Sequence, residues 1–197
     1  MVTTVFLIRH GKTSANLENR FAGRTKELLD QSGCDQVHGV ADRLNELGIN
    51  AIYAGPLART RQTAEIIGDR TGAEVYLKPE FNEILIPHWD GLTKEEISSN
   101  FDNEYPTWLS TPDKFNIPGC ETISQVQKRA VSGIEKIFFQ RAGEVVVVVS
   151  HLIVIRSLIL YYQHQPISEF RCIKVDNGAI SELSRNDEGV TEVLLDR

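Results

Sequence analysis

The chain has 197 residues, of which 41% are hydrophobic and 24% charged, and its formal net charge is −6. This length fits one domain with a substantial core, and the composition is that of an ordinary soluble globular protein. The negative charge disfavours nucleic acid and anionic membranes as partners, so an anion site needs a local cluster of positive side chains. The longest apolar run, residues 145–149, is too short to span a bilayer, and the first residues show no signal-peptide pattern. We therefore expect a cytoplasmic protein that binds neither membrane nor nucleic acid.

Three cysteines are present, an odd number at wide spacing: Cys34, Cys120 and Cys172. This spacing gives neither a disulfide framework nor a zinc motif, so we expect reduced thiols and no metal site. None of the three lies in a recognisable nucleophile context, so a catalytic cysteine is left open as an alternative without support of its own.

Apolar segments typical of strands alternate with segments of helical spacing along most of the chain. Strands are predicted over residues 5–8, 51–54, 75–77, 145–150, 172–175 and 179–183, and helices over 31–47, 57–70, 122–141 and from Leu152 onward. This alternation predicts an α/β fold with a largely parallel sheet. The last two strand candidates break the alternation, and we expect them to form a hairpin.

Residues 81–118 form a second break in the alternation. This segment contains both tryptophans and the prolines Pro87, Pro106, Pro112 and Pro118, so it does not suit one continuous element. We expect an insertion over the sheet edge, in which helical pieces at 94–100 and 103–109 form either a lid or a structural excursion. Because no internal repeat or linker is present, residues 1–197 are predicted to be a single domain.

The most informative stretch is the apolar run from Val5 to Ile8, which ends abruptly on Arg9, His10 and Gly11. Such a run suits a strand buried on both faces, and open α/β sheets place ligand sites at the carboxyl ends of these strands. Arg9 offers a planar charged fork for a phosphate or carboxylate, and Gly11 allows a sharp turn or a close approach. A lone histidine is more often structural, so the motif indicates a site only if other segments supply matching groups.

A second histidine follows another buried run, the valines of residues 145–149, in the order Ser150, His151. One interpretation is that Ser150 and His151 only cap the helix that begins near Leu152. The alternative is a shared site, because the carboxyl ends of two buried strands both present a histidine. The repetition favours the shared site.

Two further residues have chemistry that fits an anion site. Pro56 opens a predicted helix whose first turn carries Arg59, and this guanidinium is able to reach an anion above the strand ends. Arg61 points elsewhere around the helix and is expected to be solvated or ion-paired. In the insertion, Glu83 is the carboxyl best placed to protonate a leaving oxygen, although an isolated loop glutamate is usually a solvated charge.

The ordered set of motifs resembles the histidine phosphatase superfamily, in the group that includes cofactor-dependent phosphoglycerate mutases. An ordered set is far more specific than any one motif. The resemblance implies a three-layer α/β/α sandwich with a mixed, mainly parallel sheet. The matching segments, spread over most of the chain, are Arg9-His10-Gly11-Lys12-Thr13, Asn16, Pro56-Leu57-Ala58-Arg59, Gln62-Thr63-Ala64, Glu83, Trp89-Asp90-Gly91, Gly119-Cys120-Glu121-Thr122 and Val149-Ser150-His151.

The resemblance also implies a role for each matching residue. His10 is the nucleophile that becomes phosphorylated, and Glu83 acts first as general acid and then as general base. The phosphoryl group is held by Arg9, Arg59, His151 and, as an additional polar contact, Asn16. Phe21, Gly23 and the loop around Cys120 lie on the substrate side together with the insertion. No metal or cofactor is needed, because positive side chains meet the charge on the phosphoryl oxygens.

Two positions depart from the family's pattern. Gly55 lies in a tract where the family usually has serines, and Leu152 follows His151 where glycine is frequent. These changes alter the hydrogen bonds around Arg59 and the bulk beside His151, but neither removes a reacting group.

The residues after Glu83 separate two activities. Residues 84–88 lack the arginine and tyrosine set that follows the general acid in mutases, so we expect a phosphatase that hydrolyses a small phosphorylated metabolite. Candidate substrates are α-ribazole 5′-phosphate, phosphoserine and sugar or glycerate phosphates; the alternatives are a mutase-type phosphotransferase and a noncatalytic phosphate-binding module. His88, His38 and His164 are expected to be structural or exposed, with contact between His88 and substrate left open. The sequence is compatible with a homodimer and does not define the oligomeric state.

Overall fold

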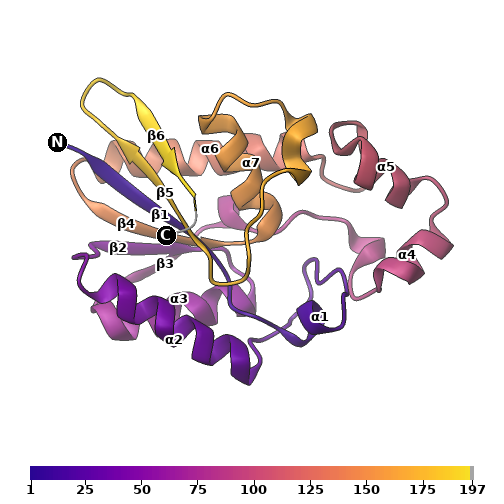
Figure 1. Cartoon of the computed structure of the whole chain (residues 1–197), viewed down its shortest axis with the longest axis horizontal. Helices are drawn as coiled ribbons and strands as arrows, with labels where there is room; N and C mark the ends of the chain where they lie inside the picture. Colours follow the sequence, from indigo (N-terminus) through magenta and orange to yellow (C-terminus); the bar gives the residue numbers. More distant parts are fainter. Residues whose placement is uncertain (196–197) are drawn as a thin grey trace.

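A computed structural model describes residues 1–195, and its centre is a six-stranded sheet in the order β3-β2-β4-β1-β5-β6 (Figure 1). The strands are β1 (Thr3–Arg9), β2 (Ala51–Ala54), β3 (Val75–Leu77), β4 (Val145–Ser150), β5 (Ile180–Arg185) and β6 (Thr191–Leu194). The strands β1 to β4 pair in parallel, whereas β5 is antiparallel to β1 and β6 is antiparallel to β5. The sheet is mixed and mainly parallel, which confirms the prediction.

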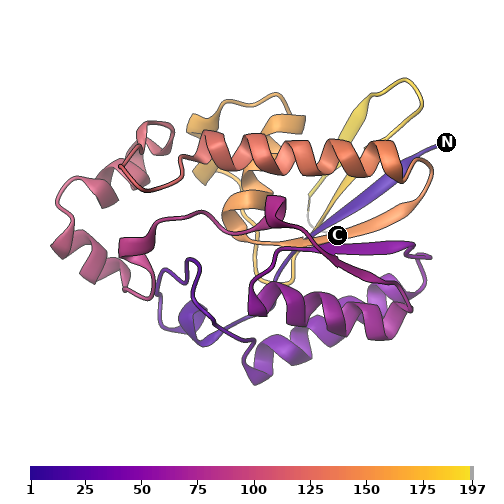
Figure 2. The same ribbon diagram turned by 180° about the vertical axis from the view of Figure 1, so that it is seen from behind.

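Helices cover both faces of this sheet and complete the expected three layers. The helices α2 (Gln31–Asn45) and α3 (Ala58–Thr71) pack on one face, and α6 (Ile123–Gln140) and α7 (Leu152–Tyr162) pack on the other (Figures 1 and 2). The bounds of α2, α3 and α6 lie within two residues of the predicted ones and α7 begins at the predicted Leu152, while the short α1 (Ser14–Leu17) is not predicted. None of the helices in residues 1–195 has the length and apolar character that a membrane span requires.

The central strands are fixed by side chains on both of their faces. In β4, Val146 and Val148 pack with α6 and α7, whereas Val147 and Val149 pack with α2 and α3. All four are fully buried, and each buried aliphatic side chain contributes about 1.5–3 kcal/mol to folding. A one-residue slip would exchange the two faces of the strand. The register that pairs Arg9 with Ser150 is therefore firmly set, and it makes the next residues, His10 and His151, neighbours.

The strand predicted over residues 172–175 is wrong. A short helix, η4 (Ile167–Arg171), precedes a loop here, and the hairpin is built from β5 and the unpredicted β6. Val175 is apolar and buried, as in a strand, but its carbonyl accepts a hydrogen bond from Arg9 at 2.8 Å. The carbonyl of Ile173 likewise accepts one from Arg156 at 2.6 Å. The carbonyls of this loop thus accept hydrogen bonds from two arginines and not from a neighbouring strand.

Residues 81–118 lie beyond the carboxyl ends of β1 and β4, at one end of the molecule (Figure 1). The segment contains η2 (Pro87–Trp89), α4 (Lys94–Asn100), α5 (Glu104–Ser110) and η3 (Pro112–Lys114), and it follows η1 (Pro79–Phe81). Buried Trp89 packs edge-on against Trp108 and 5.1 Å from the ring of Phe115. This aromatic cluster is part of the core beneath α6 and α7 and anchors the segment to it.

Candidate active site

Two neighbouring strands deliver the histidines to one place. His10 follows β1, His151 follows β4, and the centroids of their rings lie 5.2 Å apart. The backbone N–H of His10 donates to the carbonyl of Ser150 at 3.0 Å, which extends the strand pairing by one step. Both side chains are buried. The structure therefore brings together the two residues that the sequence analysis placed at a shared site.

His10 is held as a neutral imidazole with a defined tautomer. Its Nδ1 lies 2.8 Å from the carbonyl of Gly11, which only accepts, so Nδ1 carries the proton. The other nitrogen, Nε2, accepts from Nε of Arg59 at 3.3 Å. Burial lowers the pKa of His10 well below its ordinary value, and the charges of Arg59 and Arg9 add to this effect. Nε2 is therefore unprotonated at neutral pH, and its lone pair is engaged only by the long 3.3 Å hydrogen bond from Arg59.

The backbone around His10 is braced by Asn177, which the sequence analysis missed. Its side-chain amide donates to the carbonyl of His10 at 3.0 Å and to Oδ1 of Asn16 at 3.2 Å. Oδ1 of Asn16 also accepts from the backbone and hydroxyl of Thr13. Asn177 precedes Gly178 in a turn, and an Asn-Gly pair signals only a turn in sequence.

Arg9 and Arg59 are buried cations held by backbone carbonyls. Arg9 donates to the carbonyl of Val175, and Arg59 donates to the carbonyl of Gly23 at 2.6 Å. Within residues 1–195, neither guanidinium forms an ion pair with a carboxylate. Burial lowers the pKa of both, and the charge of Glu83 opposes that shift. An arginine stays protonated at neutral pH even when burial lowers its pKa. Arg9 and Arg59 therefore concentrate positive charge in this pocket.

Glu83 faces the second histidine across the pocket. Its Oε2 lies 3.9 Å from Nδ1 of His151, while its Oε1 accepts from the backbone of Ile84 at 2.8 Å. Burial raises the pKa of Glu83, against the opposing charge of Arg59. Burial also lowers the pKa of His151 well below its ordinary value. Glu83 thus keeps its proton to a higher pH than a free glutamate does, and His151 is neutral.

A charged cluster fixes the segment that carries Glu83. The backbone carbonyl of Glu83 accepts from Arg24 at 2.9 Å and from Arg129 at 3.2 Å. Glu121 forms ion pairs with both of these arginines, at 2.8 and 2.9 Å, and accepts from the backbone of Leu85. Glu121 belongs to a segment that the resemblance singled out without a role. In the structure it ties residues 83–85 to α6.

A cavity of about 420 Å³ opens above His10. The predicted residues Arg9, His10, Asn16, Phe21, Gly23, Arg59 and Glu83 all line it, as does the family departure Leu152. His151 and Cys120 are not among the lining residues; His151 lies beneath the cavity against His10, and the Cys120 thiol lies 3.7 Å from Nδ1 of His88. The outer wall contains residues that the sequence analysis did not name as site residues: Ile97, Tyr105, Trp108, Arg156, Phe170 and Arg171.

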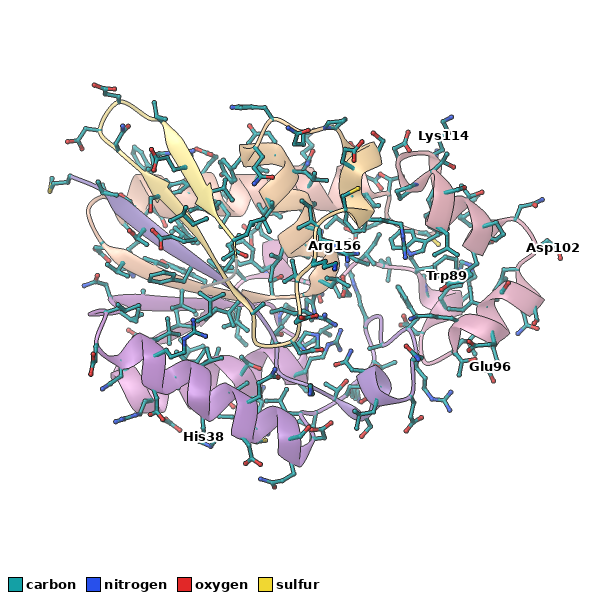
Figure 3. The ribbon with its side chains drawn as sticks, in the orientation of Figure 1. His38, Trp89, Glu96, Asp102, Lys114 and Arg156 are labelled. Atoms are coloured by element: carbon teal, nitrogen blue, oxygen red, sulfur yellow. The ribbon has the colours of Figure 1, made fainter. Side chains whose placement is uncertain are left out.

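The remaining histidines lie away from the cavity. Nε2 of His88 lies 2.6 Å from Glu104 in the insertion, and His38 and His164 are exposed. Figure 3 shows His38 on the outer face of α2, opposite the sheet. Across residues 1–195, no three His, Cys, Asp or Glu side chains group in a way that could hold a metal ion.

Gly55, one of the departures from the family's pattern, lets two backbone segments touch. A Cβ atom at this position would lie 2.5 Å from the carbonyl oxygen of Phe81 and 3.3 Å from Nε2 of His151. The same carbonyl accepts from the hydroxyl of Ser150 at 2.8 Å. The segment before Glu83 is therefore seated directly on the ends of β2 and β4.

This contact predicts that Gly55→Ala destabilises the fold by about 1–3 kcal/mol, because a backbone carbonyl cannot move aside as a flexible side chain can. Urea unfolding of the variant and the wild type measures the change. Gly39→Ala is the matched control, since a Cβ at that helical position meets nothing within 4 Å and should not destabilise. Equal stability of Gly55→Ala and wild type would contradict the close approach.

The comparison with known proteins agrees with this geometry. A sequence profile of the histidine phosphatase superfamily (branch 1) matches residues 5–196. The chain belongs to this superfamily. Members of the superfamily are phosphatases or mutases that act through phosphohistidine.

Individual superfamily members resemble the chain over almost its whole length. Phosphoserine phosphatase 1 of Hydrogenobacter thermophilus is 27% identical over 177 residues, covering 90% of this chain and 84% of the relative. The probable phosphoglycerate mutase GpmB of Enterobacter sp. is 30% identical over 184 residues, covering 91% and 83%. The solved structure of YhfR from Bacillus stearothermophilus has a TM-score of 0.93 at 25% identity and covers 98% of this chain and 96% of that chain. These likenesses confirm the predicted fold and superfamily.

Proposed function

We propose that this chain is a phosphomonoesterase that hydrolyses a small phosphorylated metabolite through a phosphohistidine on Nε2 of His10. The observation that carries this proposal is a set of buried nitrogens without partners. Nε of Arg9 and both ring nitrogens of His151 lack a hydrogen-bond partner among the described residues. Buried polar groups rarely remain unsatisfied, and a phosphoryl group above His10 offers acceptor oxygens to them. Binding of such a group would satisfy the Nε–H of Arg9 and the one N–H that a neutral His151 carries.

The first half-reaction follows from the tautomer of His10. When the phosphoryl oxygens accept the N–H of Arg59 that otherwise points at His10, the Nε2 lone pair is released and attacks phosphorus, while the proton on Nδ1 stays hydrogen-bonded to Gly11. The bond from phosphorus to the alcohol oxygen breaks, and the phosphoryl group is transferred to Nε2. Arg9, Arg59 and His151 meet the charge on its equatorial oxygens, and Asn16 adds a polar contact. Preorganised donors of this kind supply most of the stabilisation in phosphoryl transfer.

Glu83 serves both half-reactions in this proposal. Its raised pKa keeps a proton available for the departing alcohol oxygen, and a bound phosphate raises that pKa further by like-charge repulsion. Once the alcohol has left, the Glu83 carboxylate takes a proton from the water that attacks phosphohistidine. The water oxygen bonds to phosphorus, the bond to Nε2 breaks, and inorganic phosphate is released. His10 and Glu83 return to their starting states.

The residues after Glu83 favour water over a second substrate as acceptor. Ile84 and Ile86 are fully buried in the core, and His88 faces Glu104. This stretch therefore presents no cation to a mutase-type acceptor. The names of the relatives keep phosphoserine and glycerate phosphates among the candidate substrates. Sugar phosphates and α-ribazole 5′-phosphate remain candidates as well.

Two measurements on the purified chain test the reaction type. We expect release of phosphate from p-nitrophenyl phosphate in excess EDTA at the same rate as without EDTA, because arginines supply the charge that a metal supplies elsewhere. Rapid quenching should trap a phosphoprotein that is labile in acid and stable in base, as a phosphohistidine is. A folded protein that gives neither phosphate nor phosphoprotein would instead indicate a noncatalytic phosphate-binding module. Loss of activity in EDTA, reversed by added metal, would contradict the metal-independent mechanism.

A further inference from the structure

Four arginines that line the cavity are not neutralised by the protein. Arg9, Arg59, Arg156 and Arg171 form no ion pair with a carboxylate anywhere in residues 1–195. Among the other arginines of residues 1–195, all form ion pairs except the exposed Arg43 on α2. The paired arginines are Arg20, Arg24, Arg61, Arg70, Arg129, Arg141 and Arg185. The arginines without an ion pair therefore concentrate at the cavity.

Arg156 is fixed in the cavity wall next to the phosphoryl site. It projects from α7 toward the loop before β5 (Figure 3), where its Nε donates to the carbonyl of Ile173 at 2.6 Å. Arg9 donates to the carbonyl of Val175 in the same loop, so one short backbone segment orients both guanidiniums. The Arg156 guanidinium also lies 5.4 Å from the centroid of the Phe170 ring. Its terminal nitrogens make no hydrogen bond to the described protein and remain free for a ligand.

Arg171 extends this positive region outward. It ends η4, is exposed, and lines the same cavity. Burial lowers the pKa of Arg156 to about 10, and the positive charges of Arg171 and Arg9 contribute to the shift. Arg156 is thus a protonated side chain with like charges nearby. The charges of Glu83 and Asp176 raise the pKa of Arg9, whereas the charges that shift the pKa of Arg156 are those of Arg171 and Arg9.

The geometry points to a second anion subsite, formed by Arg156 and Arg171, for a carboxylate or further phosphoryl group on the leaving alcohol. This inference rests on the proposed function, which assigns Arg9 and Arg59 to the transferred phosphoryl group. With Arg9 and Arg59 on the phosphoryl group, Arg156 and Arg171 are the arginines without an ion pair that the cavity leaves for the alcohol portion. Phe170 lies beside Arg156 and packs against Trp108, and both rings are buried, which limits the access of water to Arg156 and strengthens a charge-assisted hydrogen bond there. The substrate class is therefore phosphomonoesters with a second anionic group, in preference to esters of neutral alcohols.

Matched substrate pairs test this subsite. One arm compares phosphoserine with phosphoethanolamine and 3-phosphoglycerate with glycerol 3-phosphate, which differ in a carboxylate. Another compares fructose 1,6-bisphosphate with fructose 6-phosphate, which differ in a phosphoryl group. We expect kcat/KM to favour the doubly anionic member by about 10–100-fold in at least one arm, the range for hydrogen bonds to charged groups. The arm that shows the preference identifies the second anion.

Substitution then assigns the preference to these arginines. Arg156→Met and Arg171→Met should each lower the ratio of kcat/KM within the preferred pair by about 10-fold, mainly through KM for the doubly anionic member. Arg43→Met removes the same charge from the opposite side of the sheet and should keep the ratio. Because Arg171 is exposed, its variant tests the subsite even if Arg156→Met does not fold.

Two results would overturn the inference. One is equal kcat/KM for both members of every pair in the wild type, and the other is a preference that survives in Arg171→Met and in folded Arg156→Met. In both cases hydrolysis and phosphohistidine formation would persist. Failure of the proposed function would look different, because no phosphomonoester would be hydrolysed and no phosphoprotein would be trapped.

Discussion

Replacement of His10 by asparagine is expected to lower phosphomonoesterase activity by at least about 10⁴-fold, the scale seen when a covalent nucleophile is removed. Asparagine retains an N–H that is able to donate to the Gly11 carbonyl, but it has no ring nitrogen that could accept a phosphoryl group. The loss of activity therefore comes from the missing nucleophile and not from a cavity left in the core. Activity on p-nitrophenyl phosphate and trapping of the phosphoprotein measure it directly.

His38→Asn is the control for His10→Asn, because His38 is exposed on the outer face of α2 (Figure 3). This variant should keep both activity and the phosphoprotein. His10→Asn should keep its affinity for inorganic phosphate within about 10-fold, since Arg9 and Arg59 carry most of the binding charge. If His10→Asn still formed a phosphoprotein, the nucleophile would be another residue and the proposed mechanism would fail.

The core of the site was predictable because short-range patterns encode it. Continuous apolar runs in β1 and β4 require burial on both faces, and the register of two parallel neighbours then places His10 beside His151. A proline near the start of α3 similarly located Arg59 in the first turn, where it reaches His10. His10, His151 and Arg59 thus come shortly after β1, β4 and β2, strands that their apolar residues predict.

The supports of the site were not predictable, because each depends on a contact between distant loops. Arg24 and Arg129 both donate to the carbonyl of Glu83 and form ion pairs with Glu121, and no helix or strand periodicity in the sequence indicates these contacts. The apolar residues at 172–175 predict a strand, but the carbonyls of Ile173 and Val175 bind arginines and are not paired with a neighbouring strand. The role of Arg156 was not predictable because a single charged residue within the largely apolar helix α7 forms no motif.

Glu83→Gln is expected to lower kcat/KM for an alkyl phosphate ester by about 10²–10⁴-fold, the usual contribution of general acid catalysis. The alkoxide of such an ester is a poor leaving group and needs the Glu83 proton. For p-nitrophenyl phosphate the loss should be much smaller, because p-nitrophenolate is a stable anion that departs without a proton. A comparison of kcat/KM isolates this step, since the parameter covers the reaction only through formation of phosphohistidine.

The pH profile of Glu83→Gln provides a second signature of the acid. His10 reacts when unprotonated, and burial lowers its pKa well below 6.5, so activity falls only at pH values below that figure. Glu83 reacts when protonated, and burial raises its pKa above 4.5, so hydrolysis of the alkyl ester falls as the pH rises through this raised value. Glutamine does not titrate. The variant should therefore retain the acid limb and lose the alkaline limb, measured on the same ester so that substrate ionisation is common to both proteins.

Glu80→Gln is the matched control for this prediction. Glu80 precedes Glu83 by three residues, forms an ion pair with Lys136 at 2.9 Å, and does not line the cavity. Its substitution should leave both the pH profile and the dependence on the leaving group as in the wild type. If Glu83→Gln slowed the alkyl and aryl esters equally and kept the alkaline limb, Glu83 would be a binding residue, and the proton would have to come from another group at the cavity.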